Sequence, residues 1–148
     1  MVSDPEARRR FADMIRIEGM NGGFIRAEDE RRLLQEGMTR FNLSLDEANG
    51  AMLATVNDQK MVLQRAADEG TREFLNVQAN RNRQRCLSRA DFRQAVEMYR
   101  AKARQRISED EAKRRVKALM REEGISAKRH GWIIRSRRWF NSIPEQIA

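Results

Sequence analysis

Residues 44–56, with the sequence Ser-Leu-Asp-Glu-Ala-Asn-Gly-Ala-Met-Leu-Ala-Thr-Val, contain the two signals that decide the fold class of this chain. The first is a capping box, because Ser44 can accept a hydrogen bond from the backbone of Glu47, and the Glu47 side chain can return one to Ser44. The second is the spacing of the apolar residues, which recur every three or four positions as on one face of a helix. The stretch therefore predicts an amphipathic helix over residues 45–68.

Helix caps recur along the whole chain. The further residues that are suited to cap a helix N-terminus are Asp4, Thr71, Ser88, Ser108 and Ser126. Gly22, Gly23 and Gly124 are suited to end helices, because glycine adopts positive φ without steric cost. No stretch alternates apolar and polar residues for long enough to predict a strand. The sequence therefore predicts an all-α protein without a sheet.

The length predicts one domain. A chain of 148 residues can bury a core without metals or disulfides. We expect a single helical domain over residues 1–148, built as a bundle of about six to seven helices. Within it, the polar, Asn-rich residues 78–87 are predicted to form a mobile connection, and residues 127–142 are predicted to form a basic C-terminal helix.

Composition excludes several classes of protein. Cys86 is the single cysteine, so no internal disulfide can form. No run of 18 apolar residues exists, which excludes a transmembrane helix. Residues 1–5 lack the basic and apolar segments of a signal peptide. We therefore expect a cytoplasmic protein.

Positive charge is concentrated in the second half of the chain. Residues 1–70 contain 10 Lys/Arg and 13 Asp/Glu, a net charge of −3, whereas residues 71–148 contain 20 and 9, a net charge of +11. Such a surface favours polyanions, with nucleic acid or an anionic membrane as examples. The competing interpretation is a solvated helical surface that uses arginine without a binding role.

The predicted binding residues are the basic side chains of this second half. They are Arg81, Arg83, Arg85, Arg89, Arg100, Lys102, Arg104, Arg106, Lys128, Arg129, Arg135, Arg137 and Arg138. In a C-terminal helix, Trp132 and Trp139 would share an apolar face beside a basic one. That helix could dock on the bundle, contact phosphates or lie on a membrane surface. No helix-turn-helix or zinc-finger pattern is present, so base-specific recognition is not predicted.

Signatures of catalysis are missing from the sequence. There is no phosphate-binding glycine loop and no Gly-x-Ser-x-Gly motif. His130 is the single histidine, so a histidine-based metal site or proton relay would lack partners. Cys86 has arginines nearby but no histidine beside it, and we expect it to be inert. We therefore expect no enzyme, no cofactor and no metal site.

A short pattern recurs at three predicted helix starts. Each has an aliphatic residue followed four positions later by a carboxylate, as in Ile25 with Asp29, Leu87 with Asp91, and Ile107 with Glu111. The first and third of these segments agree at further positions when they are aligned at an offset of 82 residues. An apolar residue before a helix and a carboxylate near the positive end of the helix dipole can occur in any helical bundle. The pattern therefore suggests a repeat only weakly.

Residues 21–29, Asn-Gly-Gly-Phe-Ile-Arg-Ala-Glu-Asp, resemble the Asp-Gly-x-Ile-x-x-x-Glu helix start of the tellurite-resistance TerB family. Residues 41–47 are similar to the turn that follows in that family, and the resemblance covers about residues 10–125. It implies an all-helical cytoplasmic domain that acts in larger assemblies, with acidic residues proposed to bind metal. Gly22 stands where the family has Asp, which removes the key carboxylate.

Together these observations predict a binding protein without catalytic activity. The first expectation for the partner is nucleic acid, bound through the basic C-terminal half. The alternative is a TerB-like adaptor, in which the basic half binds an acidic protein partner.

Overall fold

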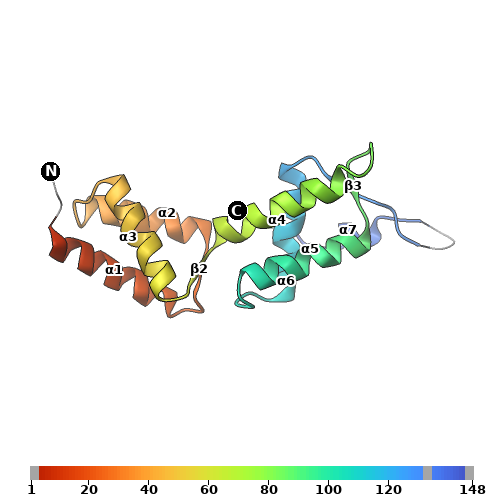
Figure 1. The fold of residues 1–148 in the computed structure, drawn as a ribbon. Coiled ribbons are helices and arrows are strands. Elements are labelled where there is room, and N and C mark those ends of the chain that lie inside the picture. Colours follow the sequence, from red (N-terminus) through yellow and green to blue (C-terminus); the bar gives the residue numbers. More distant parts are fainter. Residues whose placement is uncertain (1–3, 132–134, 146–148) are drawn as a thin grey trace. The chain divides into compact units, whose positions relative to one another are not determined.

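A computed structural model of the chain describes residues 4–131 and 135–145. In these ranges the chain forms seven helices and four strands of two residues each (Figure 1). The helices are α1 (Pro5–Gly19), α2 (Ala27–Thr39), α3 (Leu45–Asp58), α4 (Gln64–Ala79), α5 (Arg89–Lys102), α6 (Glu109–Glu122) and α7 (Arg138–Asn141). The strands are β1 (Phe24–Ile25), β2 (Val62–Leu63), β3 (Cys86–Leu87) and β4 (Ser126–Ala127). The predicted all-α class is confirmed, but the expected absence of a sheet is wrong, because the strands form two short parallel pairs.

The residues group into two compact units, where the sequence analysis expected one bundle. The N-terminal unit is Met1–Arg65 and the C-terminal unit is Ala66–Ala148. Each contains one parallel strand pair, β1 with β2 in the first and β3 with β4 in the second. The boundary lies within α4, whose first two residues belong to the N-terminal unit.

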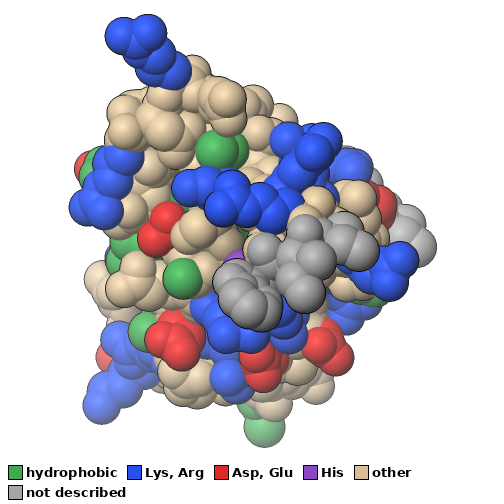
Figure 2. Space-filling model, turned by 90° about the vertical axis from the view of Figure 1, so that its right-hand side faces the viewer, with side chains coloured by type: hydrophobic (Ala, Val, Ile, Leu, Met, Phe, Trp, Pro, Cys, Tyr) green, Lys and Arg blue, Asp and Glu red, His purple; other side chains and the backbone are tan. Residues whose placement is uncertain are grey.

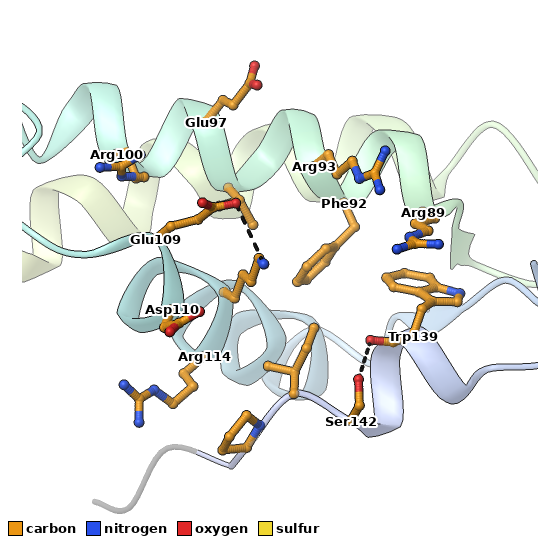
Figure 3. A pocket seen from close by; sticks show the side chains of 14 residues that line it. Arg89, Phe92, Arg93, Glu97, Arg100, Glu109, Asp110, Arg114, Trp139 and Ser142 are labelled. Atoms are coloured by element: carbon orange, nitrogen blue, oxygen red, sulfur yellow. Dashed lines mark hydrogen bonds and ion pairs between the residues drawn. The ribbon is translucent and has the colours of Figure 1, made fainter.

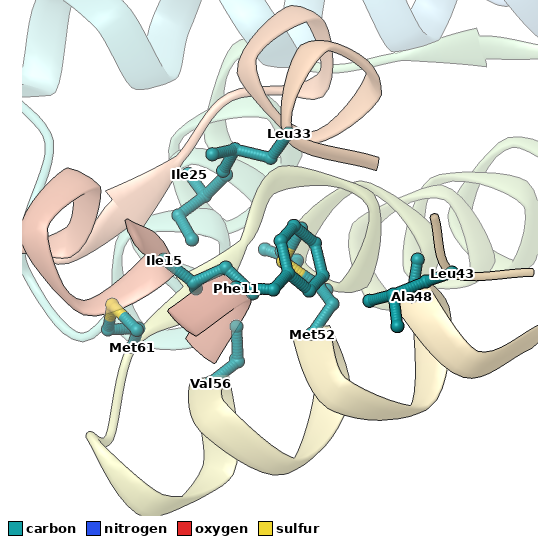
Figure 4. Packing of buried hydrophobic residues seen from close by; sticks show 10 residues of the cluster. Phe11, Ile15, Ile25, Leu33, Leu43, Ala48, Met52, Val56 and Met61 are labelled. Atoms are coloured by element: carbon teal, nitrogen blue, oxygen red, sulfur yellow. The ribbon is translucent and has the colours of Figure 1, made fainter. Parts of the chain in front are cut away.

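The core of the N-terminal unit is built from three helices and one strand. Phe11 and Ile15 of α1, Leu33 of α2 and Met52 of α3 have no exposed surface, and Ile25 of β1 lies among them (Figure 4). Phe11 and Ile15 are four positions apart, so they lie one above the other on the buried face of α1. The buried face of α1 therefore follows helical spacing.

Strand pairing closes each unit. Ile25 pairs with Leu63 in the first unit, and Leu87 pairs with Ala127 in the second. In each unit the segment before the second helix is thereby joined to the segment after the third helix. The paired residues are 38 positions apart in the first unit and 40 in the second, so no local sequence pattern reveals these contacts.

The order helix, strand, helix, helix, strand occurs twice in the chain, because α4 to β4 repeats α1 to β2. Buried positions of the two units correspond as Phe11 with Thr71, Ile15 with Leu75, Leu33 with Ala95, Gly37 with Tyr99, Met52 with Val116, and Val56 with Met120. The offset of 82 residues suggested by the sequence is therefore wrong. Ile107 precedes the third helix of its unit, so its counterpart is Leu43 and not Ile25.

Large and small side chains are exchanged between two of these corresponding positions. A Cβ atom added to Gly37 would lie 2.9 Å from Cζ of Phe11, so the glycine makes room for that ring. In the C-terminal unit the small residue is Thr71 on the first helix, and Tyr99 on the second helix is the large one; both are fully buried. Close packing explains the exchange, because a core holds only one large ring at such a contact.

The predicted helix over residues 45–68 is wrong in its second half. α3 ends at Asp58, Lys60 adopts a positive φ of 53°, and β2 follows before α4 begins. Pairing of β2 with β1 interrupts the helix. Thr71, predicted to cap a helix, lies fully buried inside α4. The caps at Asp4, Ser44, Ser88 and Ser108 are confirmed by hydrogen bonds from the backbone of the following turn.

The predicted C-terminal helix over residues 127–142 is also wrong in the described residues. Ser126 and Ala127 form β4, His130 forms a bridge with Ser136, and only Arg138–Asn141 is helical. Pairing with β3 holds the backbone of residues 126–128 extended, so Ser126 cannot cap a helix. Residues 132–134, which include the predicted apolar face at Trp132, lie outside the described residues.

Residues 78–87, predicted to be a mobile connection, contain the end of α4, a turn and β3. Asn82 holds the turn through its side chain, which accepts from the backbone N–H of Cys86 at 3.1 Å and donates to the Cys86 carbonyl at 2.9 Å. Cys86 and Leu87 are buried. The sequence is polar here because Asn and similar residues are favoured in turns, where their side chains bond to the backbone.

Candidate functional site

The β3–β4 pair brings together the two basic regions that the sequence analysis identified separately. The backbone N–H of Ser126 donates to the carbonyl of Arg85 at 3.1 Å, and the N–H of Lys128 donates to the carbonyl of Leu87 at 2.7 Å. The segment before α5 and the segment after α6 therefore run side by side. α7 lies against the same segments, because Nε1 of Trp139 donates to the carbonyl of Lys128 at 3.2 Å.

Seven basic side chains of these segments form what we name the strand-end cluster. Its members are Arg81, Arg83, Arg89, Lys128, Arg129, Arg135 and Arg138. Six are exposed and Arg89 is half-buried. None of the seven forms an ion pair with a carboxylate of the described residues. All seven were predicted as binding residues.

Two other predicted residues of the same region hold the fold together. The guanidinium of Arg85 donates to the side chains of Asn76 and Asn80 and, at 3.0 Å, to the carbonyl of Glu123. Nε of Arg137 donates to the carbonyl of Ala127 at 2.8 Å. Both side chains thus satisfy backbone or amide acceptors at the strand ends.

The remaining four predicted residues lie elsewhere in the C-terminal unit. Arg100, Lys102, Arg104 and Arg106 are at or beyond the C-terminal end of α5, whereas Arg89 is at its start. At 1.5 Å per residue, the 14 residues of α5 separate the two groups by roughly 20 Å. The structure therefore divides the predicted site into the strand-end cluster and a second group near the α5–α6 turn. One residue of each, Arg89 and Arg100, lines the pocket between α5 and α6.

A pocket of about 750 Å³ lies beside the strand-end cluster, between α5, α6 and residues 139–144 (Figure 3). Phe92 and Trp139 supply its aromatic wall, with ring centroids 5.4 Å apart at an interplanar angle of 60°. Arg89 and Arg93 stand next to these rings in Figure 3. Sequence analysis missed Arg93, although its position one helical turn after Arg89 could have indicated it.

The C-terminal wall of the pocket is fastened to α6 by a buried lysine. Lys117 is 3% exposed, and its Nζ donates to the carbonyls of Phe140 at 3.2 Å and Ile143 at 2.8 Å. It also forms an ion pair with Glu145 at 3.1 Å and lies 4.8 Å from the centre of the Phe140 ring. Two carbonyls, a carboxylate and an aromatic ring thus surround the buried amino group. No signal in the sequence pointed to this role.

The charge of the two units differs strongly. The C-terminal unit contains 20 Lys/Arg and 11 Asp/Glu, a net charge of +9, whereas the N-terminal unit contains 10 and 11, a net charge of −1. Figure 2 shows a face of the molecule on which Lys and Arg side chains gather. The positive field therefore belongs to the unit that carries the strand-end cluster.

The acidic residues in the segment that resembles the TerB family contact an arginine. Nη2 of Arg32 lies 2.9 Å from Oε1 of Glu18 and 3.3 Å from Oδ1 of Asp29. Hydrogen bonding to Glu18, followed by that to Asp29, raises the pKa of Arg32. Among the described residues, no group of three or more His, Cys, Asp and Glu side chains is arranged to hold a metal ion.

The two side chains most often used in catalysis lie apart from the pocket lining. Cys86 is buried, and its Sγ lies 3.4 Å from Oδ1 of Asn82. His130 is exposed, and its backbone bridges to Ser136. Neither belongs to the residues that line the pocket.

Comparison with models of protein families, with curated proteins and with solved structures gives no match in any of the three cases. In the part of the chain that the structure describes, no helix is long and apolar enough to cross a membrane.

Proposed function

We propose that this chain is a non-enzymatic binding protein and that its C-terminal unit binds nucleic acid through the strand-end cluster. The observation that carries the proposal is the β3–β4 pairing, which joins two basic segments into one surface whose side chains lack carboxylate partners among the described residues. Phosphate groups can pair with basic side chains that have no carboxylate partner. Arginine suits this role because it binds phosphate with two parallel hydrogen bonds.

Other basic residues of the same unit pair with carboxylates, and this contrast supports the interpretation. Arg115 pairs with Asp68, and Arg72 pairs with Glu122 and Glu123, all within the fold. Arg72 and Arg115 thus have carboxylate partners within the fold. The basic side chains of the strand-end cluster have no such partner among the described residues, so they are available to neutralise the phosphates of a polyanion.

Binding is expected to depend on phosphates and to be nearly indifferent to base sequence. α7 has only four residues, which is about one turn and too short to lie along a major groove as a recognition helix. Contacts to phosphate fix position without reading sequence. The alternative is an acidic protein partner on the same surface, as the TerB-like interpretation implies, and the same experiment distinguishes the two.

A gel-shift titration at about 0.15 M salt tests the proposal. The informative variant replaces Arg81, Arg83, Lys128 and Arg129 with glutamine. A control of equal charge replaces Arg8, Arg9, Arg10 and Arg16 with glutamine; these exposed side chains of α1 pair with carboxylates of the N-terminal unit. The wild type and the control should shift DNA and RNA, whereas the cluster variant should not.

Equal weakening by both variants would show that the net charge, and not the strand-end cluster, determines binding. Absence of any shift by the wild type at up to about 100 μM protein would overturn the proposal, because even non-specific binding is expected in that range. Binding of an acidic partner protein would then become the better explanation.

A further inference from the structure

The pocket beside the strand-end cluster combines three kinds of side chain. Phe92 and Trp139 form an aromatic wall, Arg89 and Arg93 lie next to it, and the carboxylates of Glu109 and Asp110 line the pocket as well (Figure 3). Its volume of about 750 Å³ lies within the range of small-ligand sites, roughly 300–1,000 Å³. Aromatic side chains can stack on the face of a base, and basic side chains can bind phosphate. Acidic side chains can accept hydrogen bonds from the edge of a base.

Trp139 is held in place for stacking. Its Nε1 donates to the carbonyl of Lys128 at 3.2 Å, and its ring meets Phe92 at 60° and Phe140 at 71°. Both aromatic contacts are edge contacts, so no described aromatic ring is stacked parallel to the indole. A partly exposed, fixed indole offers a face to a base at low entropic cost.

Arg89 and Arg93 can bind phosphate at the same place. They lie four positions apart on α5, so their side chains project from the same face of the helix. Neither pairs with a carboxylate of the described residues. Arg89 also belongs to the strand-end cluster, which therefore continues directly into the pocket.

The carboxylates favour a nucleobase over an acidic peptide. Glu109 and Asp110 are exposed; Glu109 pairs with Lys113 at 3.6 Å, and Asp110 forms no ion pair with a described residue. Carboxylates accept hydrogen bonds from the amino groups on base edges. The same carboxylates would repel a chain of acidic side chains.

We propose that this pocket binds one unpaired nucleotide of single-stranded nucleic acid, with its base on Trp139 and its phosphates on Arg89 and Arg93. The proposal rests on the nucleic-acid function proposed above and specifies the form of nucleic acid. A base in a duplex must first be unstacked and unpaired to enter such a pocket, which disfavours duplex.

The experiment compares a short single-stranded oligodeoxynucleotide of mixed sequence with a duplex of the same length. Trp132→Phe leaves Trp139 as the one tryptophan, so the emission of Trp139 reports stacking. The single strand should quench this emission and bind more tightly than the duplex. Trp139→Leu, with its folding checked by urea unfolding, should weaken single-strand binding by roughly fivefold or more and leave duplex binding unchanged.

Arg93→Gln is a second variant that leaves the aromatic wall in place. For the single strand, the slope of log affinity against log salt should decrease in magnitude by about 0.7, because one phosphate is no longer neutralised. Arg104→Gln is the matched control, because it removes an exposed arginine from the far end of α5. It should leave the slope unchanged.

Equal affinity for duplex and single strand with unchanged Trp139 emission would overturn the pocket proposal and leave the proposed function intact. Failure of every nucleic acid to bind would overturn both. Quenching by a polyglutamate peptide, without quenching by the oligonucleotide, would overturn the pocket proposal in favour of an acidic protein partner.

Discussion

At the scale of single residues, the C-terminal unit is organised around one carboxylate. Asp68 of α4 accepts a hydrogen bond from the hydroxyl of Tyr99 on α5 at 2.8 Å and pairs with Arg115 of α6 at 2.5 Å. One side chain thus ties three helices together. Burial, followed by the charge of Asp68, raises the pKa of Tyr99 well above its ordinary value.

Tyr99 should therefore make the protein sensitive to alkali. A tyrosine in the unfolded chain ionises near pH 10, whereas folded Tyr99 stays protonated. Its contribution to the free energy of unfolding is fully present below about pH 10 and is lost as the pH rises further, by about 1.4 kcal/mol per pH unit. Urea unfolding at a series of alkaline pH values should show this slope in the wild type and a smaller one in Tyr99→Phe.

The absorbance of tyrosinate offers a direct control, because Tyr99 is the single tyrosine of the chain. We expect the absorbance to appear together with loss of the far-ultraviolet helix signal. Ionisation near pH 10 in a protein that is still folded would contradict the prediction.

Thr71 is a second residue whose replacement should change the free energy of unfolding. It has no exposed surface, and its hydroxyl has no hydrogen-bond partner, which is an unfavourable state for a buried polar group. Thr71→Val keeps the shape and removes the hydroxyl, so the free energy of unfolding should rise by roughly 1 kcal/mol.

Thr55→Val is the matched control for this change. Thr55 is equally a buried threonine in a helix, but its hydroxyl donates to the carbonyl of Ala51 at 2.7 Å. The control should not stabilise the protein, because the hydroxyl that it removes is satisfied. Urea titration of both variants measures the difference, and stabilisation by both would contradict the explanation.

At the scale of elements, positive φ angles decide where helices stop. Gly124, two residues after the end of α6, has a φ of 67°, and Lys60, two residues after the end of α3, has a φ of 53°. In each case the chain leaves the helix and enters a strand that pairs with the preceding one. The strand pairs therefore depend on these turns.

Alanine at two glycines should have effects of opposite sign. Gly124 needs a left-handed backbone, so Gly124→Ala should cost about 1 kcal/mol. Gly50 is exposed in the middle of α3 and has open space around it, so Gly50→Ala should stabilise the fold by about 0.5–1 kcal/mol. An added Cβ meets nothing within 4 Å at either site, so backbone conformation alone is compared. Thermal unfolding measures both effects, and equal signs would contradict the argument.

At the scale of the whole molecule, the two units share a topology but differ in charge. The N-terminal unit carries −1 and the C-terminal unit +9. The same succession of elements therefore supports two different surfaces. Packing depends on buried positions that both units share, whereas charge depends on exposed positions that can differ without cost to the core.

The affinity for duplex DNA should consequently fall steeply with salt. The slope of log affinity against log salt should be about −0.9 for each neutralised phosphate. Glutamine at Arg81, Arg83, Lys128 and Arg129 should reduce its magnitude by about 0.9 for each phosphate that the variant no longer neutralises. Fluorescence anisotropy at several salt concentrations measures the slope. The α1 control variant should retain the wild-type slope, and an equal reduction in that variant would place the phosphate-binding residues outside the strand-end cluster.

The sequence by itself determined the helical class, four of the helix starts and the uneven charge. Caps such as Ser44 and Ser108 act within one turn of a helix, so neighbouring residues suffice to predict them. Charge is additive along the chain, and the residues of the strand-end cluster could therefore be identified without a structure. Their assembly into one surface could not be predicted.

Only the tertiary structure decided where the chain is extended and which basic residues meet. The segments 62–63 and 126–127 are too short to show a strand pattern, and their partners lie 38 and 40 positions away. Pairing at these positions ended α3 at Asp58 and replaced most of the expected C-terminal helix. The same pairing placed Arg89 beside the segment of Lys128, because backbone hydrogen bonds between distant segments override local helix propensity.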